Sequence, residues 1–241
     1  MTHLSVNINK IALLRNSRGG NNPDVLQFAE KCLACGAHGI TLHPRPDQRH
    51  ARYQDVLDLN KLIQSHPSAE LNVEGNPTPE FLRIVKQARP AQCTLVPDDP
   101  HQLTSDHGWN LTANGEKLKP IIRELKDAGI RVSLFLDFDS QEIEKAKGIG
   151  ADRIELYTEP YAKAYNTPDR AEVLSKYREA AARAQAAQLG VNAGHDLSLE
   201  NLETFLQIPG ILEVSIGHAL IVECLSLGLE KTIRSYLAIT G

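Results

Sequence analysis

Three histidines and two glutamates stand at the ends of short apolar runs, or within them. His43, His195 and His218 each come at or just after the end of such a run. Glu74 lies near the end of another run, and Glu155 lies inside a further one. A carboxylate in an apolar strand is costly unless it is paired or functional. Histidine and a buried glutamate can both move protons near neutral pH, so the five residues together predict general acid–base chemistry.

Anion binding is the second chemistry that the residue types indicate. Gly194 and Gly217 follow the last two apolar runs, where their backbone N–H groups could approach an anion closely. A helix beginning near Ala219 would add free N–H donors and its dipole. These two features predict one phosphate region, and basic residues in the early loops predict a second. The basic residues are Lys10, Arg15, Arg18, Arg45, Arg49 and His50.

These side chains would converge if the apolar runs were the strands of a (β/α)8 TIM barrel. Strand-like runs alternate with helical patterns, as parallel strands joined by crossovers require. In this fold the active site lies at the C-terminal ends of the strands. We therefore expect one (β/α)8-barrel catalytic domain over residues 1–241, with an open doubly wound sheet as the alternative. The predicted strands are Leu4–Asn9, Gly39–Pro44, Leu71–Gly75, Gln92–Pro97, Arg131–Asp137, Arg153–Thr158, Gly190–Ala193 and Glu213–His218.

Proline, serine and glycine mark the boundaries of the predicted helices. These helices are Pro23–Cys35, one with Pro79 in its first turn, Lys117–Ala128, Ser140–Lys147, Pro168–Gln188 and Ser198–Gln207. Residues 98–116 lack periodicity and hold the only tryptophan, Trp109. Such a long loop predicts a lid that excludes water, with an oligomer contact or a plain surface loop as the alternatives.

Composition limits the partners that this chain could have. Hydrophobic residues make up 41% and charged residues 23%, which is ordinary for a globular protein. A net charge of -4 argues against nucleic-acid binding, and no run approaches the roughly 20 apolar residues that span a membrane. Four cysteines and no visible signal peptide favour a cytoplasmic protein. Cys32 and Cys35 form a C-x-x-C late in a predicted helix, so we expect a structural role for them.

Eight segments, in order along the chain, resemble those of the pyridoxine 5′-phosphate synthase family. They are VNINKIALLRNSRGG (6–20), HGITLHPRPDQRH (38–50), LNVEG (71–75), CTLVPDD (93–99), RVSLFLDFD (131–139), IELYT (154–158), VNAGHDL (191–197) and IGHALI (216–221). The resemblance implies a (β/α)8 barrel with additional helices that assembles as a homo-octamer. It implies condensation of 3-amino-2-oxopropyl phosphate with 1-deoxy-D-xylulose 5-phosphate to pyridoxine 5′-phosphate, phosphate and water. It implies no metal and no organic cofactor.

The resemblance also implies roles for individual residues. His43 and Glu74 match the proton acceptors, and His195 matches the proton donor. Glu155 matches a carboxylate that stabilises the transition state. The remaining matches hold phosphate: Asn7 and Arg18 for the aminoketone, Arg45, His50 and Thr104 for the deoxyxylulose, and the pair Gly217 and His218 in the last loop.

Two positions depart from the family pattern. Asn9 and Lys10 stand where many members have Asp-His, and a lysine there could still meet a phosphate as a point charge. Asp196 stands where many members have glycine. Its backbone N–H could serve the substrate while its side chain caps the next helix, or its carboxylate could face the phosphate and repel it.

Three rival functions remain open from the sequence. Another phosphate-binding barrel, such as a sugar-phosphate isomerase or epimerase, would turn over a single substrate. A metal-dependent hydrolase would use His43, His195 and His218 as ligands, although the arginines near His43 disfavour a bound cation. A non-catalytic homologue would bind ligands without turnover.

Overall fold

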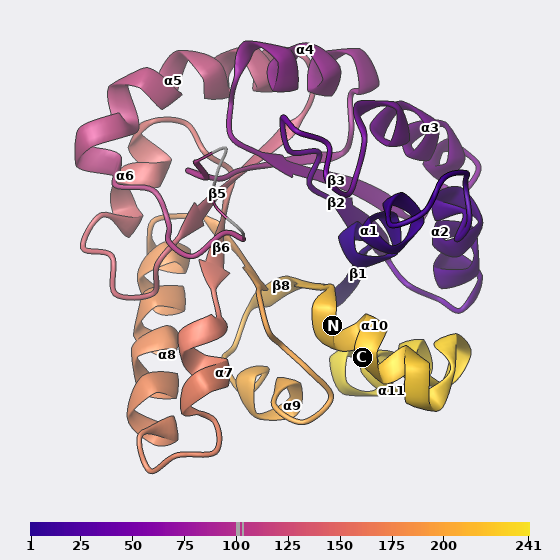
Figure 1. The fold of residues 1–241 in the computed structure, drawn as a ribbon. Coiled ribbons are helices and arrows are strands. Elements are labelled where there is room, and N and C mark those ends of the chain that lie inside the picture. Colours follow the sequence, from indigo (N-terminus) through magenta and orange to yellow (C-terminus); the bar gives the residue numbers. More distant parts are fainter. Residues whose placement is uncertain (100–101, 103) are drawn as a thin grey trace.

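The computed structural model describes residues 1–99, 102 and 104–241. Within this part of the chain, eight parallel strands close into a barrel in sequence order, with β8 pairing to β1 (Figure 1). The prediction of a (β/α)8 barrel is confirmed, and the open-sheet alternative is wrong. The strands are β1 (His3–Asn7), β2 (Gly39–Leu42), β3 (Glu70–Gly75), β4 (Gln92–Leu95), β5 (Arg131–Leu136), β6 (Arg153–Tyr157), β7 (Gly190–Gly194) and β8 (Ile211–Ile216).

The helices form a ring around the barrel and connect successive strands (Figure 1). Two helices, not one, lie between β1 and β2 and between β6 and β7, and two follow β8, so the expected additional helices are present. The helices are α1 (Asn9–Asn16), α2 (Val25–Ala34), α3 (Tyr53–Gln64), α4 (Pro79–Ala88), α5 (Leu111–Asp127), α6 (Ile143–Gly148), α7 (Glu159–Ala164), α8 (Arg170–Ala186), α9 (Leu202–Phe205), α10 (His218–Leu227) and α11 (Leu229–Thr240).

Several predicted helix boundaries were wrong. Helix α5 begins at Leu111, because the Asn110 side chain accepts the N–H of Ala113 at 2.9 Å and caps it. The irregular segment predicted at 98–116 therefore ends at Asn110, before the predicted boundary. Residues 100, 101 and 103 of that predicted lid lie outside the described residues. Helix α6 begins at Ile143, and the hydroxyl of Ser140 instead accepts the N–H of Glu142 before the helix starts.

The barrel wall alternates between apolar and polar side chains. Leu4 and Val6 of β1 are fully buried in the core that the strands share with the helices. The residue between them, Ser5, has its hydroxyl 2.7 Å from that of Thr41 on the neighbouring strand. Successive strand residues point to opposite faces, so these hydroxyls line the barrel axis. This layer is polar, where barrels of this type usually stack branched apolar side chains.

Both ends of the chain lie on the same side of the barrel (Figure 1). The N–H of Thr2 donates to the carbonyl of Thr240 at 2.9 Å. At the end of α2, Cys32 is buried, and burial raises the pKa of its thiol, the opposite of what a redox motif needs. No helix in the described ranges is both long enough and apolar enough to cross a membrane.

Candidate active site

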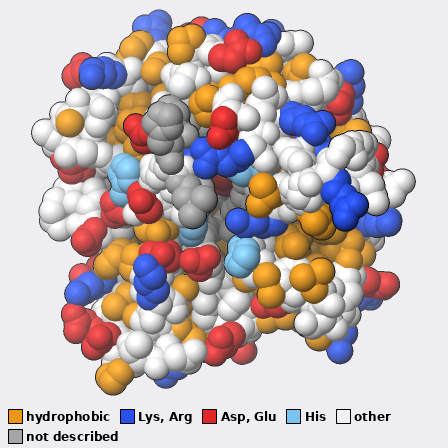
Figure 2. Space-filling view, viewed as in Figure 1, with side chains coloured by type: hydrophobic (Ala, Val, Ile, Leu, Met, Phe, Trp, Pro, Cys, Tyr) orange, Lys and Arg blue, Asp and Glu red, His pale blue; other side chains and the backbone are white. Residues whose placement is uncertain are grey.

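The C-terminal ends of the strands open on the face shown in Figure 2. Histidine, basic and acidic side chains gather around the middle of this face (Figure 2). Four predicted residues reach it from four segments: His43 follows β2, Glu74 lies in β3, Glu155 in β6, and His195 follows β7. The strand-end rule thus brings residues that are far apart in sequence to one end of the barrel.

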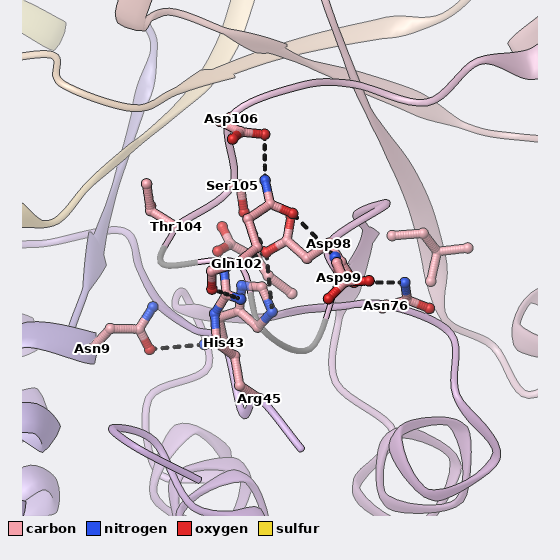
Figure 3. A network of polar contacts seen from close by, with 12 residues as sticks. Asn9, His43, Arg45, Asn76, Asp98, Asp99, Gln102, Thr104, Ser105 and Asp106 are labelled. Atoms are coloured by element: carbon pink, nitrogen blue, oxygen red, sulfur yellow. Dashed lines mark hydrogen bonds and ion pairs between the residues drawn. The ribbon is translucent and has the colours of Figure 1, made fainter. Parts of the chain in front are cut away.

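His43 is a buried base held by the segment after β1. Its backbone N–H donates to the side-chain oxygen of Asn9 at 2.9 Å (Figure 3). Its ring is only 7% exposed, and its Nε2 lies 3.9 Å from Oδ2 of Asp98. Burial, and after it the positive charge of Arg45, lowers the pKa of His43 well below its ordinary value. The ring is therefore neutral near pH 7 and able to accept a proton.

Glu74 is a half-buried carboxyl whose charge changes near neutral pH. The side-chain amide of Asn7 donates to its Oε2 at 3.5 Å. Burial, and after it the carboxylate of Asp98, raises the pKa of Glu74 to about 8. A group with such a pKa can both accept and return a proton under working conditions.

Glu155 lies deeper in the barrel and is 3% exposed. The hydroxyl of Thr94 donates to its Oε2 at 3.4 Å. Burial, and after it the carboxyl of Glu74, raises the pKa of Glu155 well above its ordinary value, so its neutral form is favoured. Gly194 leaves room for it, because a Cβ at that position would lie 2.4 Å from Oε1 of Glu155.

The loop after β4 binds the arginine that follows β2. Arg45 donates from Nη1 to the carbonyl of Gln102 at 2.8 Å and from Nη2 to Oδ2 of Asp98 (Figure 3). Ser105 donates its hydroxyl to the same Asp98 oxygen at 2.7 Å. The other oxygen, Oδ1 of Asp98, is buried without a hydrogen-bond partner among the described residues. Sequence reasoning missed Asp98 as a site residue, although it lies just beyond the C-terminal end of β4.

His195 stands on the opposite side of the mouth in an unusual backbone conformation. Its φ is 97° and that of Asp196 is 57°, both in the left-handed region. Its Nε2 lies 3.1 Å from the hydroxyl of Thr104, and its ring packs edge-on against Tyr157 with centroids 5.1 Å apart. Thr104 therefore contacts His195 in this structure. The predicted helix cap at Asp196 is wrong, because Asn201 occupies the N-cap of α9.

The predicted anion-binding residues are only partly assembled. His50 accepts the N–H of Ala51 at Nδ1, and burial and then Arg45 lower its pKa to about 4, so its ring is neutral. Arg18 is exposed in the segment after α1. The candidate cation Arg15 is 2% exposed and makes a bidentate pair with Asp55 at 2.7 and 2.9 Å. Because this ion pair satisfies the guanidinium, Arg15 is not an anion-binding residue in this structure.

The last loop approaches the first strand closely. A Cβ on Gly217 would lie 3.1 Å from the Cβ of Asn7. His218 is exposed and begins α10, and Lys10 is an exposed residue of α1. Among the described residues, no three His, Cys, Asp or Glu side chains are grouped so that they could hold a metal ion.

Comparisons with known proteins identify the relatives of this chain. A family model described as "Pyridoxal phosphate biosynthesis protein PdxJ" matches residues 4–241. A protein named pyridoxine 5′-phosphate synthase from Xanthomonas campestris pv. campestris (strain B100) is 55% identical over 246 aligned residues, covering 99% of this chain and 96% of the relative. A protein of the same name from Porphyromonas gingivalis is 52% identical and covers 98% of both chains.

Solved structures share the fold at low sequence identity. A 3-hexulose-6-phosphate synthase has a TM-score of 0.65 at 12% identity and covers 100% of both chains. A phosphoribosyl anthranilate isomerase from Thermus thermophilus has a TM-score of 0.60 at 14% identity, covering 99% of this chain and 98% of that one. At such identities the likeness shows the barrel fold alone.

Proposed function

This chain belongs to the PdxJ family of pyridoxal phosphate biosynthesis proteins, and we propose from this premise that it is a pyridoxine 5′-phosphate synthase. It condenses 3-amino-2-oxopropyl phosphate with 1-deoxy-D-xylulose 5-phosphate and releases phosphate and water. The observation that carries the proposal is the identity of 52% to 55%, over nearly the whole chain, with proteins of that name. Neutral His43, and Glu74 and Glu155 with raised pKa values, lie at one mouth of the barrel and support the proposal.

The proposed roles follow from the protonation states. Neutral His43 and the ionised fraction of Glu74 accept protons as the amine attacks the ketone and as later intermediates rearrange. His195, on the far side of the mouth, returns a proton to the departing oxygen. Glu155, buried and neutral, offers an O–H to charge that develops on oxygen in the transition state.

The phosphate groups are held by the rim in this proposal. Asn7 and Arg18 bind the aminoketone phosphate, together with Gly217 and His218 and the N–H groups that begin α10. Arg45, His50 and Thr104 bind the other phosphate, and the neighbouring backbone of Asn9, Lys10 and Asp196 completes the rim. In this structure Arg45 donates hydrogen bonds to Asp98 and to the carbonyl of Gln102. These hydrogen bonds must break when Arg45 binds a phosphate.

The decisive experiment is an assay of the purified, chelator-treated protein with both substrates. We expect pyridoxine 5′-phosphate and phosphate to appear together, and neither product when one substrate is omitted. Turnover of a single sugar phosphate would instead support the isomerase or epimerase alternative. Tight binding of both substrates by folded protein without product would support a non-catalytic homologue.

We also propose that the protein is a cytoplasmic homo-octamer. Exposed apolar side chains on two neighbouring helices support association with further copies of the chain. These are Leu13 and Leu14 of α1 and Val222, Leu225 and Leu227 of α10. Small phosphorylated molecules are its other proposed partners, with no nucleic acid, membrane, metal or organic cofactor required.

A further inference from the structure

We propose that Asp196 is a positioning residue for the proton donor: its carboxylate faces Nδ1 of His195 and orients the ring. The proposal rests on the proposed function, in which His195 gives a proton to the reacting substrate. If only the backbone N–H of Asp196 bound substrate, its side chain would have no role. The proposal gives the carboxylate one.

The unsatisfied ring nitrogen is the first observation. Nδ1 of His195 is buried and has no hydrogen-bond partner among the described residues. A buried polar atom without a partner is costly, so such atoms are normally paired or have a function. Oδ2 of Asp196 lies 3.8 Å from this nitrogen. At this distance the carboxylate lies next to the ring nitrogen but is not hydrogen-bonded to it.

The backbone holds the two side chains in this relation. Both residues have positive φ, a conformation that is uncommon for residues other than glycine, although aspartate and histidine adopt it more often than most. The hydroxyl of Thr158 donates to the carbonyl of His195 at 2.5 Å, and the amide of Asn201 donates to the carbonyl of Asp196 at 3.1 Å. A strained turn fixed by two hydrogen bonds at the mouth is typical of a functional segment.

The two ring nitrogens of His195 consequently have different surroundings. Nε2 lies beside the hydroxyl of Thr104 at the mouth, and Nδ1 lies beside the carboxylate of Asp196. If Asp196 accepts from Nδ1–H, the proton that the ring gives to substrate is carried on Nε2, the nitrogen nearer the reaction. When substrate binds, its oxygen replaces the hydroxyl of Thr104 as the hydrogen-bond partner of Nε2.

The charge on Asp196 persists through the working pH range. The hydrogen-bonding influence of His195 is the largest cause that lowers the pKa of Asp196 below its ordinary value. His218 of α10 and Lys163 of α7 act in the same direction. Among the described residues, Tyr157 of β6 packs against the ring of His195. Asp196, Glu159 of α7 and Asp106 of the loop after β4 all contribute to the raised pKa of Tyr157.

The test compares Asp196→Asn with wild type and with Glu200→Gln. Asparagine keeps the size and tolerates the positive φ, so the fold is retained and only the charge is removed. Glu200 is an exposed carboxylate of the same β7–α9 segment that bonds to Asn166, which makes it a matched control. kcat and KM for both substrates are measured from pH 5.5 to 9.5, with circular dichroism as a check on folding.

We expect Asp196→Asn to lower kcat about tenfold, because the ring of the proton donor loses the partner that orients it. KM for both substrates should stay nearly unchanged. Asp196→Glu, which restores the charge, should recover part of the loss, and Glu200→Gln should match wild type.

Two results would overturn the proposal while leaving the proposed function intact. In the first, Asp196→Asn makes pyridoxine 5′-phosphate with the kcat of wild type. In the second, KM for one substrate falls while kcat does not change, which would mean that the carboxylate faces a phosphate. Absence of product from wild type itself would instead overturn the proposed function.

Discussion

His43 is neutral and almost fully buried, and its ring lies next to guanidinium groups that oppose a second charge. We therefore predict that His43→Asn lowers kcat by about 10²–10⁴-fold, because a general base is lost while the amide keeps a similar volume. KM should change much less. His66→Asn is the control, since His66 pairs with Glu30 on the outer surface. Steady-state assays with both substrates decide this, and a mutant with near-normal kcat would exclude His43 as a base.

Gly194 is required by the neighbouring carboxyl and not by its backbone angles. A Cβ there would lie 2.4 Å from Glu155 and 3.4 Å from the carbonyl of Ser215. We predict that Gly194→Ala displaces Glu155, lowers kcat at least tenfold and costs about 1–3 kcal/mol of stability. Gly148→Ala is the matched control because its Cβ would meet nothing within 4 Å. Urea unfolding and kcat check both effects, and unchanged values for Gly194→Ala would contradict this steric account.

At the scale of the elements, the strands were predictable and several helices were not. Buried apolar runs fix strands whatever surrounds them, so all eight strand predictions overlap the observed ones. Helix α1 was missed because its N-cap, Ile8, offers no side-chain hydrogen bond and so leaves no start signal in the sequence. The start of α5 was placed too late because Gly115 and Pro120 hide the helical pattern that begins at Leu111.

Some site residues were likewise predictable from the sequence, and others were not. The strand-end rule could bring His43, Glu74, Glu155 and His195 to one mouth, because it depends on topology alone. The partners of Arg45 could not be foreseen, since they come from the path of the loop after β4. Salt bridges made by a loop depend on side-chain distances that no sequence spacing specifies. The roles of the site residues therefore remain predictions for mutagenesis.

The fluorescence of Trp109 can report changes in the loop after β4. The only tryptophan, Trp109, lies at the end of this loop and donates its indole N–H to the carbonyl of Leu95 at 2.9 Å. A phosphate that takes Arg45 from Asp98 should release the loop and change the fluorescence of Trp109. We predict that Asp98→Asn reduces the inorganic phosphate needed for a half-maximal change by several-fold, because a competing carboxylate is removed.

Arg45→Met provides the control for that titration. It should abolish the response to phosphate, because the guanidinium that binds the anion is gone. The same phosphate dependence in wild type and Asp98→Asn would show that Asp98 does not compete for Arg45.

At the scale of the whole molecule, the exposed leucines predict how copies associate. Leu225 is 83% exposed on α10, and α10 contacts α1, which carries the exposed Leu13 and Leu14. Large exposed apolar side chains that gather on one face usually mark a protein interface. We predict that Leu225→Glu shifts the molecular mass in light scattering toward smaller species, while Ala171→Glu, on the exposed side of α8, leaves it unchanged. Identical masses for both mutants would place the interface elsewhere.

The polar barrel interior gives the molecule an unusual dependence of stability on pH. Burial raises the pKa values of Glu74, Glu155 and Glu213, so the folded state holds protons that the unfolded chain releases. For Glu74 the ordinary value of 4.5 rises to about 8. Its stabilising protonation is complete below the ordinary value and is lost as the pH rises through about 8.

Glu74→Gln removes this titration and keeps the neutral shape. We predict that, relative to wild type, the mutant gains on the order of 1–3 kcal/mol in free energy of unfolding between pH 5 and pH 8. Urea unfolding of both proteins at matched concentrations measures the difference. Glu80→Gln is the control and should show a nearly constant difference over this range. Its partner Arg83 lowers the pKa of Glu80, so the effect of Glu80 on stability changes only below the ordinary value of 4.5. A Glu74→Gln difference that stays constant with pH would mean that Glu74 is ionised in the folded barrel, and its proposed exchange of protons with the substrate would fail with it.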